Sequence, residues 1–179
     1  MAQFRRLGGL GFLLIVSVGL LGARDQGATA PPPAAAGPQE VTVLGLLVDE
    51  RTQQPTIVLQ GKRDKRAFAM VIGPAEATGI AFPLQKVTPP RPLTHDLFLT
   101  LFGRLHVTVT KAVITDLRDN TYYATLFLSA NGTALELDSR PSDAIALAIR
   151  AKAPVFAEDR VFDKAELLPT GPTGSGPRI

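Results

Sequence analysis

The sequence contains no cysteine, and this absence excludes several kinds of chemistry. The protein can form no disulfide, cannot bind a metal through thiolates and has no cysteine nucleophile. An N-terminal apolar run with no cysteine behind it also excludes anchoring as a lipoprotein. Histidine is scarce as well, because only His95 and His106 are present. Any imidazole chemistry therefore depends on one of these two residues.

A clear surplus of basic charge is also missing from the body of the chain. The formal net charge is +3, but the first thirty residues contribute three arginines and one aspartate. The remainder carries 16 basic and 15 acidic residues and is nearly neutral. Sequence-independent binding of nucleic acid usually depends on a basic surplus. Binding of RNA or DNA would need a local patch. The best candidate is the turn with Lys62, Arg63, Lys65 and Arg66, although an ordinary solvated hairpin is the simpler interpretation.

The N-terminal segment has the layout of an export signal. Arg5 and Arg6 precede an apolar run of fifteen residues, Leu7–Leu21, which is shorter than the roughly 20 residues of a membrane span. Ala28-Thr29-Ala30 has the form of a cleavage site, but Pro31 directly after it disfavours cleavage there. Cleavage further upstream and retention as an anchor both remain open. We expect an exported protein that is periplasmic, extracellular or membrane-anchored, with the export machinery or the membrane as the partner of this segment.

Four segments are expected along the chain. Residues 1–27 form the export signal or N-terminal anchor, and residues 28–39 form a linker rich in proline and alanine. Residues 40–167 have the apolar patterning of one globular domain, which is long enough to bury a core without disulfides. Residues 168–179 are rich in proline and glycine and are predicted to be disordered.

The pattern of the central segment predicts a single compact α+β domain. Its sheet should be mostly antiparallel or mixed, with three to four helices packed on it. Strands are expected at Val41–Val48, Thr56–Gln60, Ala67–Ile72, His106–Asp116, Thr121–Ser129, Thr133–Leu137 and Pro154–Phe156. Helices are expected from Pro74 to about Leu84, at Asp96–Phe102, from Pro141 or Ser142 to Ala151, and as a last turn or two around Val161–Leu167.

Two stretches place similar polar groups at the start of a predicted helix. Residues 89–96 and residues 138–150 each combine an arginine, a hydroxyl and a carboxylate with a following apolar run. Ordinary core packing does not require so many polar groups at two such similar positions. We therefore expect the two helix starts to meet in one shared polar centre.

His95 and two carboxylates are the candidate catalytic residues of this centre. His95 lies near the positive end of a helix, which favours a neutral ring able to act as a base or to bind a metal. Asp96 and Asp143 are candidate acids or bases, but a carboxylate in a first helical turn also stabilises the helix without any catalytic function. His95 could likewise serve only to hold its loop through a hydrogen bond. Both interpretations remain open.

The arginines and hydroxyls of the same stretches are candidates for substrate binding. Arg91 and Arg140 suit phosphate, because a planar guanidinium can donate two parallel hydrogen bonds. Internal ion pairs with the neighbouring carboxylates are an equally good explanation for both arginines. Thr94 and Ser142 complete this set, and both are also candidate helix caps.

Glu76 and Asp138 are candidate metal ligands beside the catalytic carboxylates. If these groups meet, their oxygens suit a divalent cation such as Mg²⁺ or Mn²⁺, which phosphodiester cleavage commonly uses. The sequence has no HExxH motif and no EF-hand loop. A metal site is therefore a hypothesis that depends on the fold.

Three motifs in order resemble the bifunctional nuclease family over roughly Val41 to Ala165. They are Ile72–Ala77, Arg91–Leu97 and Arg140–Ala148. The resemblance implies an α+β domain that hydrolyses phosphodiester bonds of RNA or DNA with little sequence preference. The alternative is a non-catalytic binding or regulatory domain of the cell envelope that keeps the fold. A homo-oligomer is compatible with either interpretation.

Overall fold

The computed structural model describes residues 37–169. The expectations for residues 1–27, for most of the 28–39 linker and for residues 170–179 lie outside the described residues. Within the described part, no helix is both long enough and apolar enough to cross a membrane.

Two antiparallel groups of strands form most of the sheet, as the alternating apolar patterns predict. The first group is β1 (Gln39–Val48), β2 (Pro55–Gly61) and β3 (Ala67–Val71), and the second is β4 (Val107–Arg118), β5 (Thr121–Ala130) and β6 (Thr133–Ser139). Asn131 and Gly132 join β5 to β6 with φ angles of 50° and 84°. Such left-handed pairs form the tight turns that suit the twist of a hairpin.

Two short strands complete one eight-stranded sheet. Strand β7 (Val155–Ala157) lies between the two groups, parallel to β4 and antiparallel to β1, and β8 (Leu167–Leu168) pairs with β3 at the far edge. The strand order is β6-β5-β4-β7-β1-β2-β3-β8. The sheet is therefore mixed but mostly antiparallel, as expected.

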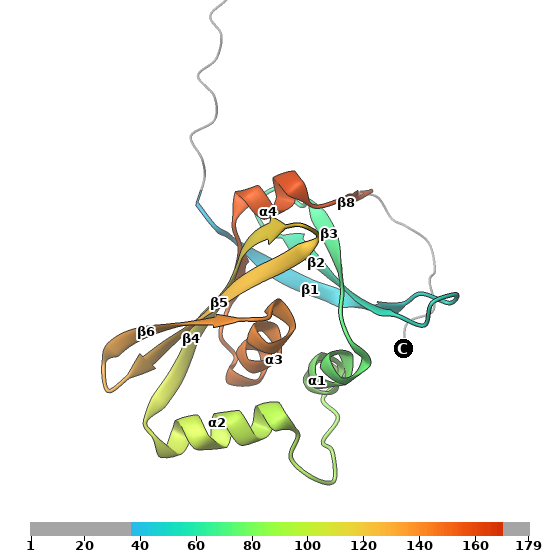
Figure 1. The fold of residues 1–179 in the computed structure, drawn as a ribbon. Helices are drawn as coiled ribbons and strands as arrows, with labels where there is room; N and C mark the ends of the chain where they lie inside the picture. The colour runs from blue at the N-terminus through green and yellow to red at the C-terminus, as the bar shows by residue number, and fades with distance from the viewer. Residues whose placement is uncertain (1–36, 170–179) are drawn as a thin grey trace, which may run out of the picture. The chain divides into compact units, whose positions relative to one another are not determined.

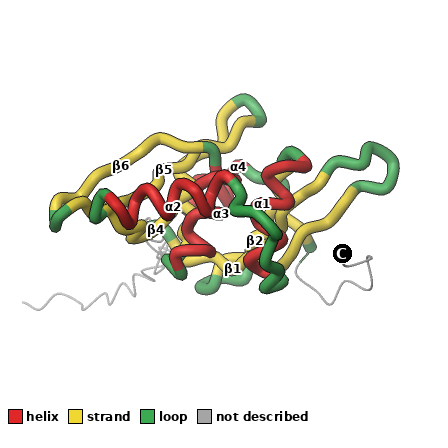
Figure 2. The backbone as a smooth tube through the Cα atoms, turned by 90° about the horizontal axis from the view of Figure 1, so that it is seen from below, coloured by secondary structure: helices red, strands yellow, loops and turns green. Residues whose placement is uncertain are grey.

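Four helices pack on this sheet and confirm the α+β class. They are α1 (Pro74–Leu84), α2 (Thr94–Arg104), α3 (Pro141–Ala151) and α4 (Asp159–Lys164). Helices α1, α2 and α3 gather on one side of the curved sheet, and α4 lies near β3 at its other end (Figure 1). Figure 2 shows the same three helices in front of the strands when the molecule is seen from below.

The core lies where α3 meets the strands. Seven of the eleven residues of α3 are buried, in agreement with its apolar Ala-Ile-Ala-Leu-Ala centre. At the other end of the core, the Phe68 ring stacks on Tyr122 at 5.8 Å and meets Phe162 edge-on at 5.2 Å. These aromatic pairs join β3, β5 and α4 into the same core.

Several local expectations are wrong in detail. Thr94 is the first residue of α2 rather than its cap, and Leu93 occupies the cap position. Helix α3 begins at Pro141, one of the two expected starts, but the candidate cap Ser142 is a buried residue within the helix, and Arg140 occupies the cap position. The last helix, α4, ends at Lys164. Leu168 was expected in the disordered tail, but it belongs to β8 and pairs with Ala67 of β3. These positions depend on partners that are distant in sequence, so local signals misplace them.

Candidate functional site

The starts of α1, α2 and α3 surround one cleft with a volume of about 360 Å³. Its lining comes from the first two turns of α1, from the first turns of α2 and α3, and from the residues just before α2 and α3: Ala75, Glu76, Thr78, Gly79, Leu93, Thr94, His95, Arg140 and Asp143. The N-terminal end of a helix carries partial positive charge and unpaired N–H groups. Three such ends beside one space favour an anion there.

A continuous chain of polar contacts crosses this cleft. The Arg140 guanidinium contacts Glu76 of α1 at 2.8 Å and donates to both oxygens of Asp143, at 2.7 and 3.2 Å. The Asp143 carboxylate in turn lies 3.5 Å from Nε2 of His95 on α2. The hydrogen bonds to Asp143 raise the pKa of Arg140 above its ordinary value, so this group stays charged. The structure thus brings the two predicted helix starts together, and adds α1.

His95 is seated against the backbone of α1. A Cβ atom on Gly79 would lie 2.7 Å from Cε1 and 3.0 Å from Nδ1 of the imidazole, closer than atoms tolerate. Only glycine therefore leaves room for the ring in this place. The His95 side chain is 13% exposed, with Nε2 on the side of Asp143. The close approach holds the imidazole at the edge of the cleft.

Arg150 anchors the three helices behind the cleft, and the sequence interpretation gave it no role. Its guanidinium donates to Asp96 of α2 at 2.7 Å and to the carbonyls of Gly79 and Ala146 at 2.5 and 3.1 Å. The side chain is only 8% exposed. The available signal was an arginine directly after the apolar run Ala144–Ile149, because a buried charge requires partners.

Asp96, a predicted catalytic residue, belongs to this anchor. Its second oxygen accepts a hydrogen bond from the Leu93 N–H at 2.8 Å. Burial alone would raise the pKa of Asp96, but the hydrogen bonds from Arg150 and Leu93 outweigh it and lower the pKa below its ordinary value. Asp96 is not among the residues that line the cleft. Asp96 therefore lies beside the cleft, where its contacts hold the start of α2 in position.

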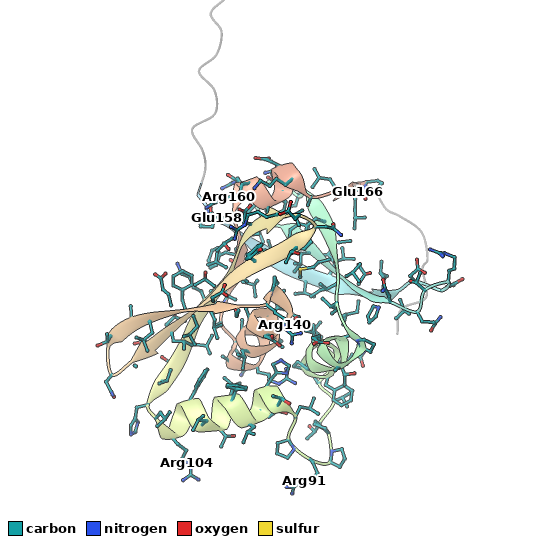
Figure 3. All side chains as sticks on the ribbon, viewed as in Figure 1. Arg91, Arg104, Arg140, Glu158, Arg160 and Glu166 are labelled. Atoms are coloured by element: carbon teal, nitrogen blue, oxygen red, sulfur yellow. The ribbon has the colours of Figure 1, made fainter. Side chains whose placement is uncertain are left out.

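The remaining predicted site residues are divided between the cleft and its surroundings. Glu76 and Thr94 line the cleft, whereas Ser142 is buried in α3. Asp138 is exposed on β6 and does not line the cleft. Figure 3 shows Arg91 at the outer tip of the loop between α1 and α2, away from Arg140.

The donor groups do not suit a divalent cation. Among residues 37–169, no three histidine, aspartate or glutamate side chains converge in a way that could hold a metal ion. Glu76 and Asp143 both direct oxygens at Arg140, and Asp138 lies outside the cleft. Because Mg²⁺ and similar ions require several oxygen ligands together, we derive no step through a metal.

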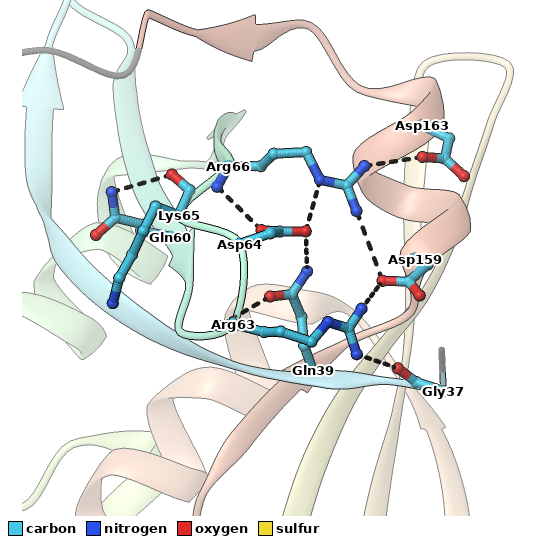
Figure 4. A network of polar contacts seen from close by, with 9 residues as sticks. All are labelled: Gly37, Gln39, Gln60, Arg63, Asp64, Lys65, Arg66, Asp159 and Asp163. Atoms are coloured by element: carbon cyan, nitrogen blue, oxygen red, sulfur yellow. Dashed lines mark hydrogen bonds and ion pairs between the residues drawn. The ribbon is translucent and has the colours of Figure 1, made fainter. Parts of the chain in front are cut away.

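Three of the four basic residues in the turn between β2 and β3 are paired with carboxylates. Arg63 contacts Asp159 of α4, and Arg66 contacts both Asp64 and Asp163 (Figure 4). Lys62 is paired in the same way with Glu40. These pairs tie the β2–β3 turn to α4 and to the beginning of β1. The paired residues therefore hold the turn in the fold, a role that neither the phosphate-patch interpretation nor the solvated-hairpin interpretation predicted.

Replacing Asp64 with asparagine should lower stability at neutral pH and have little effect in acid. Burial opposes ionisation of Asp64, but hydrogen bonds from Gln39 and Arg66 hold its pKa below its ordinary value. The ionised group therefore stabilises the fold above that value, and the contribution is lost as the pH falls through the lower folded-state pKa. We expect a loss of about 1–2 kcal/mol at pH 7 for Asp64→Asn.

Urea unfolding at pH 7 and near pH 2 measures this difference. The exposed Asp138→Asn variant is the matched control, and its free energy of unfolding should equal that of the parent at both pH values. An equal loss for Asp64→Asn at both pH values would contradict the assignment.

The fold and the cleft define a small α+β domain with one polar cleft where three helix N-termini meet. Comparison with known families gives the particular family. The model of the bifunctional nuclease domain matches residues 57–169, and the chain belongs to this family. An uncharacterized protein of Mycobacterium tuberculosis is 38% identical over 129 residues, which cover 72% of this chain and 77% of the relative.

Proteins named as nucleases are more distant relatives. Bifunctional nuclease 1 of Oryza sativa subsp. indica is 30% identical over 95 residues, covering 51% of this chain and 29% of the rice protein. The bifunctional nuclease of Oryza minuta matches to the same extent. Membership of the family is thus shown, whereas nuclease activity appears only in the names of relatives that match part of this chain.

Proposed function

We propose that the cleft binds a phosphodiester of RNA or DNA and hydrolyses it with little sequence preference. One observation carries this proposal: three helix N-termini and Arg140 face the same space as the His95–Asp143 pair. The helix ends and the guanidinium suit a phosphate, and the imidazole suits proton transfer. Contacts of this kind recognise the backbone and carry no base identity. The names of the rice relatives agree with this substrate class.

Each cleft residue has a defined role in the proposed reaction. The phosphate lies at the helix N-termini, where Arg140 offsets its charge as negative charge develops in the transition state. The Arg140 side chain is 65% exposed, so it can turn from Glu76 toward a substrate without crossing packed residues. His95 accepts the proton of the attacking water, and Asp143 stabilises the imidazolium that forms. The imidazolium returns this proton to the leaving oxygen as the phosphorus–oxygen bond breaks, which gives a phosphate monoester and an alcohol.

Cleavage assays with cleft variants of the full chain test this proposal. We expect the parent to cut fluorescent single-stranded RNA or DNA, and His95→Ala and Asp143→Asn to lose activity by roughly 100-fold or more. Asp138→Asn is the control, because the same chemical change falls on an exposed residue outside the cleft. Parallel reactions with EDTA report whether a metal contributes.

Melting temperatures separate a catalytic role from a structural one. Loss of cleavage with an unchanged melting temperature supports the proposal. A parent that cuts neither substrate, or a His95→Ala variant that cuts as fast as the parent, would refute it.

A non-catalytic binding or regulatory domain is the second candidate function. The specific observation in its favour is that Arg140 is already paired with both Glu76 and Asp143. In that case the polar chain mainly joins α1, α2 and α3. The same variants distinguish the two functions, because Asp143→Asn would then lower the melting temperature of a parent without cleavage activity.

A further inference from the structure

Glu76 is the charged residue of the cleft lining to which the proposed reaction gives no role. His95 and Asp143 transfer the proton and Arg140 offsets the charge of the phosphate, whereas Glu76 only contacts Arg140 in the free protein. A carboxylate beside a space that is proposed to hold a phosphate is unexpected, because like charges repel. Its presence therefore requires a physical reason.

The Glu76 carboxylate is held at the cleft from two sides. Glu76 is in the first turn of α1, where the partial positive charge of the helix end favours an acid. The side chain folds back over Gly73, so closely that a Cβ atom there would collide with Oε2. Oε1 contacts the Arg140 guanidinium at 2.8 Å, and the side chain is only 20% exposed. The negative charge is thus a fixed part of the cleft.

The carboxylates that line the cleft outnumber its guanidinium groups. Glu76 and Asp143 both face Arg140, so the lining carries a formal charge of −1 when the imidazole is neutral. Each of the three helices also has an acid in its first turn, which offsets part of the positive potential of its N-terminal end. The balance of charge in the cleft therefore suits a ligand with a small negative charge better than a highly charged one.

A fixed carboxylate distinguishes phosphates by their charge. A phosphodiester carries one negative charge, whereas a phosphate monoester carries nearly two at neutral pH, because its second proton has a pKa of about 6. The Coulomb energy is proportional to the charge of the ligand, so the carboxylate opposes a monoester about twice as strongly as a diester. Attraction to Arg140 also grows with ligand charge, but it is present whether or not the carboxylate is there.

We propose that Glu76 is a specificity-determining residue, which makes the cleft select monoanionic phosphodiesters over dianionic phosphate monoesters; this inference rests on the proposed function. The same charge weakens binding of the monoester that cleavage produces, and so favours its release. The cleft is therefore suited to internal diester bonds and is a poor site for terminal phosphates.

Binding of two matched phosphates to the full chain tests this role without any cleavage. The probes are phenyl phosphate, which is a dianion at pH 8, and methyl phenyl phosphate, which keeps the ring and carries one charge. Nuclear magnetic resonance of the His95 imidazole, at the edge of the cleft, follows each titration. We expect the parent to bind the diester more tightly than the monoester at pH 8. At pH 5, where both probes carry one charge, this preference should disappear.

Replacing Glu76 with glutamine should remove the preference. We expect affinity to rise roughly 25-fold for the monoester and roughly 5-fold for the diester, since one unit charge nearby in water changes binding of a monoanion by about the smaller factor. Glu76→Asp keeps the charge and should keep the parental preference. A change in helix stability or in the position of Arg140 affects both probes alike, so the ratio of the two affinities reports the charge alone.

Glu166→Gln is the matched control, because the same chemical change falls on an exposed residue at the other end of the molecule from Arg140 (Figure 3). It should bind both probes as the parent does. Asp143 is unsuitable for this test, because its replacement also removes the partner of His95.

Three results would overturn the role of Glu76. They are an unchanged ratio of affinities in Glu76→Gln, a parent that prefers the monoester at pH 8, and a parent that binds neither probe. Cleavage by a parent whose preference does not depend on Glu76 would refute this inference alone. A chain that shows the expected preferences but cuts no nucleic acid would refute the proposed hydrolysis and leave the selectivity of the cleft in place.

Discussion

Replacing Arg150 with methionine is expected to lower the free energy of unfolding by about 3 kcal/mol. The substitution leaves the Asp96 carboxylate without its arginine and removes the donors to the carbonyls of Gly79 and Ala146. Because Asp96 is 35% exposed, water partly compensates, and the expected loss is at the lower end for a buried pair. For a domain of this length the melting temperature should fall by roughly 10 °C.

Two further variants make the Arg150 prediction specific. Arg150→Lys should recover only part of the loss, because one ammonium cannot bridge three acceptors on α1, α2 and α3 as a planar guanidinium does. Arg160→Met, at an exposed position, should change the free energy of unfolding by less than about 0.5 kcal/mol. Chemical unfolding monitored by circular dichroism measures all three. A stability of Arg150→Met equal to that of Arg160→Met would show that Arg150 does not anchor the helices.

Replacing Gly79 with alanine is expected to displace His95 and to reduce cleavage by roughly 100-fold. The new Cβ would lie 2.7 Å from the imidazole, and the ring is the part that can move, because the α1 backbone is held by helix hydrogen bonds. Fold stability should be preserved, since alanine favours a helix over glycine by about 1 kcal/mol. The variant would therefore separate activity from stability.

Gly103→Ala is the matched control for this substitution. Gly103 is also a helical glycine, but a Cβ there has no atom within 4 Å. Nuclear magnetic resonance of the two histidine rings reports the geometry directly. We expect a changed signal for His95 in Gly79→Ala only, together with an unchanged His106. An unmoved His95 resonance, or equal activity of the two variants, would contradict a role for Gly79 in seating the ring. The resonance test does not depend on the proposed activity.

The local sequence determined most of the secondary structure. The apolar alternation around Val109 and Leu126, the Asn131-Gly132 turn and the proline at the start of α1 and of α3 each depend on near neighbours. The α+β class followed from these elements. Thr94 and Ser142 were misjudged because a hydroxyl near a helix start is compatible with both capping and a place inside the helix. The choice is made by contacts with other elements.

The sequence alone identified the unusual polar residues at the helix starts, but the tertiary structure decided which of them line the cleft and which lie beside it. His95, Arg140 and Asp143 meet because α2 and α3 begin at the same place, whereas Asp96, next to His95 in the sequence, points to Arg150. Adjacent residues on a helix are about 100° apart, so one lines the cleft and the other faces α3. The roles of Arg150 and Gly79 depend on atoms more than fifty and about fifteen residues away, respectively, and only the packed helices bring those atoms together.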